Sequence, residues 1–235
     1  MQIIQKILLV APVLLFSVIA HEIAHGWAAL RQGDRTALDA GRLTWNPKPH
    51  IDPFFTILLP IMTIAGSVAA GGRPMVFGGA RPVPVDPRNY RHPRLGDIIV
   101  SLAGVATNAL IVVACVVLFA LTGVLGRATP PLLGTLGVVQ AMCVIGVQIN
   151  ALLIAFNLLP IPPLDGSHVF KYLMPRPLAV QYVRFRRFGL IALIALLAWG
   201  DRLLYAWMRP FFAVADGFLS LAQPLLLVTT GQWVR

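Results

Sequence analysis

Residues 3–25 of this 235-residue chain read IIQKILLVAPVLLFSVIAHEIAH, an apolar run that ends in two histidines and a glutamate. A helix needs about 20 residues to cross the hydrocarbon layer of a bilayer. The run reaches that length, so we interpret Ile3–Leu30 as a retained membrane-spanning helix. A cleavable signal peptide is the alternative, but a cut near Ala20 would destroy the polar motif at the end of the run.

Apolar blocks recur along the rest of the chain. Four more are nearly free of charge: Ile98–Leu121, Leu136–Phe156, Phe188–Trp199 and Phe211–Val228. The first two are long enough to cross a bilayer, and the last two reach that length only with their flanks. In the whole chain 57% of residues are hydrophobic and 12% are charged, against about 25% charged in a soluble domain. The composition predicts an all-α polytopic integral membrane protein.

The net charge of +10, with a pI near 10.8, would suggest nucleic-acid binding in a soluble protein. Here the cations lie in loops between apolar blocks, which the positive-inside rule explains. We therefore expect the lipid bilayer, and not nucleic acid, as a partner. Cys115 and Cys143 lie within apolar blocks and have no CxxC neighbours, so we expect neither a disulfide nor a thiolate metal site.

Two irregular segments follow the first helix. Phe54–Ala70 is apolar but contains Pro60 and Gly66, which suits a segment that dips into the membrane and returns while it lines a cavity. Met75–Val85 alternates prolines with valines at its end, which suits an edge strand. If the first segment is re-entrant, all three basic loops lie on one side of the membrane, and the positive-inside rule makes that side the cytoplasm. These loops are Arg31–Lys48, Arg73–Arg94 and Lys171–Arg187.

The polar end of the first helix is an H-E-x-x-H motif, His21-Glu22-Ile23-Ala24-His25. Residues four apart on a helix project from one face, so two imidazoles can bind one zinc ion and the glutamate can activate a water. The alternative, a set of polar helix-end caps, suits a single histidine. It explains two histidines and a glutamate beside a membrane span less well, because ionisable groups there are costly and mark function.

A catalytic zinc needs a third protein ligand. His50 and His92 lie in loops beside basic residues and proline, where a solvated surface histidine is the better interpretation. Asp165 follows three prolines that break the helix at the membrane edge. A turn aspartate is the alternative, but the parity of the spans returns Asp165 to the leaflet that holds His25. The role of His168 stays open.

With these residues in place, the chain resembles the compact site-2 proteases, a family of intramembrane zinc metalloproteases, without the PDZ and CBS modules of many relatives. The matching stretches are HEIAH (His21–His25), SLAGVATN (Ser101–Asn108) and NLLPIPPLDG (Asn157–Gly166). The resemblance covers roughly Ile3 to His168, and the pairing of HExxH with a distal LDG is highly specific. One departure is Val105, where the family usually has proline, and it concerns the local helix shape before Asn108.

The resemblance implies a core of three transmembrane helices around a zinc site, together with a re-entrant or β-like segment and additional C-terminal helices. It implies one Zn²⁺ per chain, held by His21, His25 and Asp165, with Glu22 as general base and acid.

The resemblance further implies that Asn157 steadies the oxyanion and that Asn108 faces the same cavity. We expect one membrane domain over residues 1–235, with a catalytic core at about 3–170 and accessory helices at about 186–230.

The implied reaction is hydrolysis of peptide bonds in or near the transmembrane segments of a protein or peptide substrate. It would take place in a prokaryotic cell membrane, with the active site toward the cytoplasm. Met75–Val85 would hold an extended substrate by strand addition, and a plain connector is the alternative. Two other classes compete. A metal transporter would need ligating groups along a path through the bilayer, and a non-proteolytic zinc-binding membrane protein would lack Glu22 or a ligand.

Overall fold

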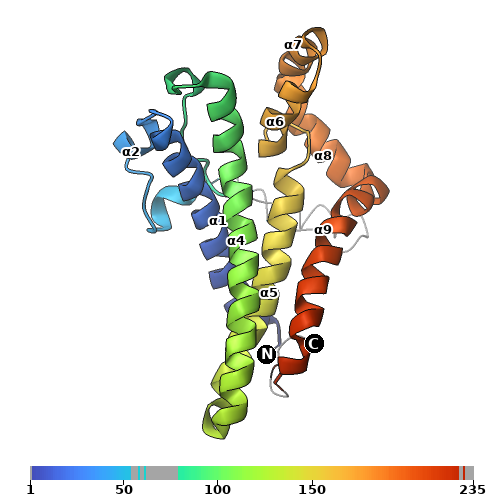
Figure 1. Ribbon diagram of the computed structural model, residues 1–235. Helices are drawn as coiled ribbons and strands as arrows, with labels where there is room; N and C mark the ends of the chain where they lie inside the picture. Colours follow the sequence, from blue (N-terminus) through green and yellow to red (C-terminus); the bar gives the residue numbers. More distant parts are fainter. Residues whose placement is uncertain (1, 54–57, 59–60, 62–78, 228–229, 231–235) are drawn as a thin grey trace.

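The computed structural model describes residues 2–53, 58, 61, 79–227 and 230, and the statements below concern these residues. Three helices are long and apolar enough to cross a membrane: α1 (Gln2–Arg31), α4 (Pro93–Ala128) and α5 (Leu133–Asn157). This confirms the prediction of an all-α membrane protein with a core of three spans. Figure 1 shows α1, α4 and α5 side by side, with α4 antiparallel to the other two.

Shorter elements connect and extend these spans. They are α2 (Thr36–Asp39), η1 (Lys48–His50), η3 (Pro87–Asn89), η4 (Pro130–Leu132), α6 (Asp165–Leu173), α7 (Arg176–Phe185), η5 (Arg186–Phe188), α8 (Gly189–Trp199), α9 (Asp201–Ala222) and η6 (Gln223–Leu225). The described part of the chain contains no strand, so residues 79–85 of the expected edge strand form no ladder. Residues 75–78 and nearly all of the expected re-entrant segment, 54–70, lie outside the described residues.

The C-terminal helices form a bent pair. The continuous stretch from α7 to α8 meets α9 at an angle of 92°, and the two parts satisfy the length and hydropathy of a span only when taken together. In Figure 1, α9 descends alongside α5. The indole Nε1 of Trp207 on α9 donates to the carbonyl of Ala155 on α5 at 2.7 Å. The predicted block Phe211–Val228 begins at the middle of α9, and α9 packs against α5 and α4.

Small side chains let these helices approach closely. Val112 on α4, Val147 and Ala151 on α5, and Ala215 on α9 form one buried cluster. Such contacts suit a membrane protein, because lipid tails are as apolar as the side chains and association depends on close packing.

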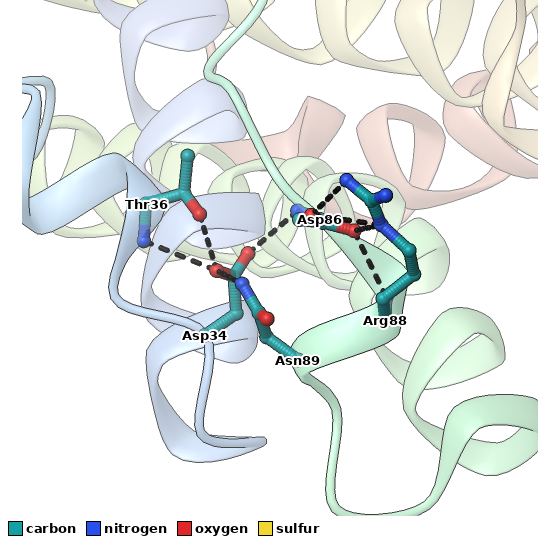
Figure 2. Close-up of polar contacts among 5 residues, drawn as sticks. All are labelled: Asp34, Thr36, Asp86, Arg88 and Asn89. Carbon is teal, nitrogen blue, oxygen red and sulfur yellow. Dashed lines mark hydrogen bonds and ion pairs between the residues drawn. The ribbon is translucent and has the colours of Figure 1, made fainter.

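Polar loops gather at the end of the bundle where α1 ends and α4 begins. Figure 2 shows Asp34, just after α1, at the centre of contacts between two loops. Its buried carboxylate accepts hydrogen bonds from Thr36 N and Oγ1 at 3.1 and 2.5 Å, from Asp86 N at 2.7 Å and from Asn89 Nδ2 at 3.0 Å. These bonds tie the loop that follows α1 to the segment that precedes α4. The polar end of the bundle therefore has a defined shape without regular secondary structure.

Candidate metal centre

The two histidines of the HExxH motif lie on one face of α1, as their spacing predicts. Because α1 continues through the motif to Arg31, the rings stand one turn apart, and the Nε2 atoms of His21 and His25 are 3.0 Å apart. The His21 side chain is buried and that of His25 is partly buried.

The structure brings Asp165 to the same point. Asp165 is the first residue of α6, and its Oδ2 atom lies 3.2 Å from His21 Nε2 and 3.3 Å from His25 Nε2. Gly166 makes this placement possible, because a Cβ there would lie 2.3 Å from the carbonyl oxygen of Leu158. Among the described residues, these three side chains form a group with metal-binding geometry.

The triangle of donor atoms fits a zinc ion. Ligands at 2.0–2.2 Å from a tetrahedral zinc lie about 3.3–3.5 Å from one another, and the three separations here are 3.0, 3.2 and 3.3 Å. Oδ2 of Asp165 is buried and makes no hydrogen bond of good geometry with any described residue. Electron-pair donors that converge in this way repel one another unless a cation lies between them. The donor set of two imidazoles and a carboxylate is also one that catalytic zinc prefers.

The second nitrogen of each imidazole is also engaged. His25 Nδ1 lies 2.7 Å from the carbonyl oxygen of Val100 on α4, so this nitrogen carries the proton and Nε2 presents its lone pair. His21 Nδ1 lies 3.1 Å from Nδ2 of Asn108, a fully buried residue whose Oδ1 has no described partner. Exchange of the amide oxygen and nitrogen, which are assigned rather than observed, lets Oδ1 accept from His21 Nδ1. Asn108 therefore lies where it can orient the His21 ring.

Gly104 completes the site, and the sequence analysis did not single it out. A Cβ at this position on α4 would lie 2.5–2.6 Å from ring atoms of both His21 and His25. Only a glycine lets α4 approach the two histidines so closely. Its place in the LAGV stretch was the available signal, but the face of α4 that packs on α1 was not known from the sequence.

A second polar cluster fixes α6, and it answers the open question of His168. Asp97 on α4 is buried and receives His168 Nδ1 at 3.1 Å, Lys171 Nζ at 2.5 Å and Tyr172 Oη at 2.9 Å. Burial and the hydrogen bond to Asp97 raise the pKa of Tyr172 to about 12, so its hydroxyl remains a donor. The cluster binds the helix that begins at Asp165 to α4.

The remaining predicted residues lie as follows. Asn157 ends α5, and its Nδ2 donates to the Leu153 carbonyl of its own helix at 2.9 Å; its role at the oxyanion stays a prediction. The interpretation of His50 as a surface residue is wrong. It is buried, with Nε2 2.9 Å from the carbonyl oxygen of Thr44, because the loop that contains it folds back on itself. His92 is exposed before α4, as expected.

Glu22 lies between the two histidines in the motif and is half-buried. Its Oε2 atom accepts a hydrogen bond of 2.7 Å from the backbone N–H of Val83. This contact joins the candidate base to the segment between residues 79 and 86, far from α1 in the sequence.

Comparison with known proteins gives a consistent result. Residues 133–197 match the family described as Peptidase family M50. The candidate zinc metalloprotease YwhC of Bacillus subtilis is 37% identical over 183 residues, which are 78% of this chain and 77% of YwhC. The candidate zinc metalloprotease Rip2 of Mycolicibacterium smegmatis is 29% identical over 213 residues, 88% of this chain and 74% of Rip2. No solved structure matches the chain.

Proposed function

This chain belongs to peptidase family M50 and is a membrane zinc metalloendopeptidase of the site-2 protease type, and we propose that it hydrolyses peptide bonds in or near the transmembrane segments of membrane proteins. The observation that carries the proposal is the triangle of donor atoms from His21, His25 and Asp165, with Glu22 in the same motif. One zinc ion per chain would occupy it.

The chain's own residues would divide the work of hydrolysis. A bound zinc supplies Lewis acidity, which lowers the pKa of a water toward about 7 and polarises a carbonyl. Glu22 takes the proton of the attacking water as the new C–O bond forms, and delivers it to the nitrogen of the leaving amine as the C–N bond breaks. Asn108 and the Val100 carbonyl hold the two imidazoles in place. Asn157 would donate to the oxyanion.

The setting of the reaction follows from charge. The basic loops that flank the polar end of the bundle favour the cytoplasmic side of a prokaryotic cell membrane, since cations are enriched there. The relatives of this chain come from bacteria. The substrate would be a transmembrane protein or peptide that has been unwound, because a helix hides its carbonyl groups in its own hydrogen bonds.

The first test measures zinc content and cleavage of a generic transmembrane substrate in detergent. We expect Glu22→Gln to keep its zinc and lose cleavage by more than 100-fold, as for removal of a general base. We expect Asp165→Ala to lose zinc. Full cleavage by Glu22→Gln would overturn the mechanism. A wild-type protein with stoichiometric zinc and no cleavage would indicate a transporter or a non-proteolytic zinc-binding protein.

A further inference from the structure

The segment from residue 81 to residue 86 lies against α1 without forming a strand, and three of its backbone N–H groups donate to α1 or to the residues that follow α1. Arg81 N–H donates to the His50 carbonyl at 2.8 Å, Val83 N–H donates to Glu22 at 2.7 Å, and Asp86 N–H donates to Asp34 at 2.7 Å. All of the acceptors lie on α1 or on the loop that follows it. An irregular segment with this many directional contacts has one defined position.

Arg42 contacts the carbonyl groups of the same segment. Its side chain is buried, and its Nη2 donates to the carbonyl oxygens of Arg81 and Pro82 at 2.7 and 3.3 Å. Residues 81 and 82 immediately precede Val83. The guanidinium therefore sets the position of the peptide bond between Pro82 and Val83, whose N–H reaches Glu22. Arg42 acts on one side of Val83 and Asp34 on the other.

Side-chain packing adds a second constraint. Val83 is buried, and its Cγ1 lies 3.1 Å from the point where a Cβ on Gly26 would stand. Gly26 follows His25 on α1, and the Leu43 side chain fills the same space. Val83 thus packs against the turn of α1 that carries His25.

Proline leaves this segment few donors. Pro82 and Pro84 have no N–H, Arg81 N–H is bonded to His50, and Val83 N–H is bonded to Glu22. Residues 81–84 therefore offer no N–H to an extended substrate. Strand addition, the role expected for Met75–Val85, does not suit these four residues, whereas orientation of Glu22 uses the donor that they do have.

We infer that Arg42 is a positioning residue for peptide hydrolysis: it holds residues 81–83 so that the Val83 N–H orients the Glu22 carboxylate. The bond fixes one carboxylate oxygen and thereby fixes the direction of the other, which a general base needs in order to reach its proton. The inference rests on the proposed role of Glu22. It does not depend on the identity of the substrate.

The test compares Arg42→Met, Arg42→Lys and an amide-to-ester replacement at Val83, which removes the N–H, weakens the Pro82 carbonyl as an acceptor and leaves every side chain unchanged. The shorter Arg42 contact, to the Arg81 carbonyl at 2.7 Å, is not altered by the ester. The control is Arg35→Gln, because Arg35 lies in the same loop with an exposed side chain. For each protein in detergent we would measure kcat and KM on one transmembrane substrate, zinc stoichiometry, the visible spectrum of the Co²⁺-substituted form, and Tm.

We expect kcat to fall about 100-fold in Arg42→Met and in the Val83 ester, the scale of a misplaced catalytic group. KM, zinc content and the Co²⁺ spectrum should stay at wild-type values, and Arg42→Lys should recover part of kcat. Tm should fall in Arg42→Met, because two backbone carbonyls lose their donor, but the protein should remain folded at the assay temperature. Unchanged kcat in the Val83 ester would overturn the inference. So would a changed Co²⁺ spectrum or lost zinc in that variant, which would indicate a role in the metal site itself. If Arg42→Met does not fold, the ester decides.

Failure of the proposed function would look different. In that case the wild-type protein would show no cleavage, or Glu22→Gln would cleave normally, whatever the Arg42 variants do. If the wild type cleaves and Glu22→Gln does not, the Arg42 and Val83 results test only the positioning role.

Discussion

The polar end of this molecule and its apolar shaft are built by different forces. The polar end consists of the loops 32–50 and 79–92 with α6, and hydrogen bonds and ion pairs define its shape, as at Asp34 and Asp97. The shaft consists of α4 from Val112 onward and the parts of α5 and α9 that pack against it. Small apolar side chains such as Ala215 pack there. Among the described residues, the side chains that could hold a metal ion converge at the polar end alone.

The polar end and the shaft therefore make different contributions to the protein. Directional bonds place atoms to within a few tenths of an ångström, which a metal centre requires. Apolar packing stabilises the bundle but tolerates small shifts of one helix against another. Substitutions of residues that support the metal centre should therefore change zinc binding or kcat, and substitutions in the shaft should change stability with the zinc retained.

Gly104→Ala should have the largest effect, because the added methyl would overlap ring atoms of both His21 and His25. We expect loss of zinc and of cleavage, measured by metal analysis and by assay. Gly134→Ala is the matched control. A Cβ there meets no atom within 4 Å, so zinc should be unchanged. Stoichiometric zinc in Gly104→Ala would contradict the close approach of α4.

Asp97→Asn should weaken zinc binding about tenfold, the lower end of the range for groups that support metal ligands. The reason is that His168 and Lys171 on α6 lose their charged partner, and the helix that begins with Asp165 loosens. Competition with a chelator measures the affinity. Asp39→Asn, which removes an exposed ion pair with Arg35 at 3.6 Å, should leave the affinity unchanged.

Gln140→Leu probes the shaft. The buried amide donates to the Phe119 and Leu225 carbonyls and accepts from Leu227 N and Thr230 Oγ1. Loss of these bonds leaves buried backbone groups unpaired, and we expect about 1–3 kcal/mol of destabilisation. Zinc stoichiometry, measured at temperatures below Tm, should remain at the wild-type value. A loss of zinc below Tm would show that the shaft and the polar end are coupled.

The smallest effect should appear as a dependence on pH through Asp34. Burial raises the pKa of Asp34, but the hydrogen bonds from Thr36, Asn89 and the Asp86 backbone lower it by more, so the net pKa lies below the ordinary value. A depressed carboxyl pKa adds stability that is present above the ordinary value and lost as pH falls through the folded-state value. The difference in Tm between wild type and Asp34→Asn should therefore be largest near neutral pH and shrink in acid. A constant difference would argue against this role.

Local patterns predicted a large part of the site. His21, Glu22 and His25 follow from helical spacing at the end of an apolar run, and the three spans follow from hydrophobic length. The parity of those spans also led to Asp165, since each crossing reverses the side of the membrane. These inferences needed only short-range geometry and the thickness of a bilayer.

Other features depend on which faces of the helices meet. Gly104, Asn108 and Asp97 share α4, yet nothing in that apolar stretch states that Gly104 and Asn108 face α1 and that Asp97 faces α6. His50 was misjudged for the same reason, because burial of a loop residue depends on how the loop folds over its neighbours.

The sequence alone was sufficient to predict the membrane spans and the proximity of His21, His25 and Asp165, because hydrophobic length, helical period and the parity of the spans need only short-range geometry and the thickness of a bilayer. Three features emerged only in three dimensions. They are the hydrogen bonds from Arg42 to the carbonyls of residues 81 and 82, the bond from Val83 to Glu22, and the anchoring of α6 by Asp97. Each joins residues far apart in the chain, and such contacts depend on the packing of whole helices and loops, which no local pattern encodes.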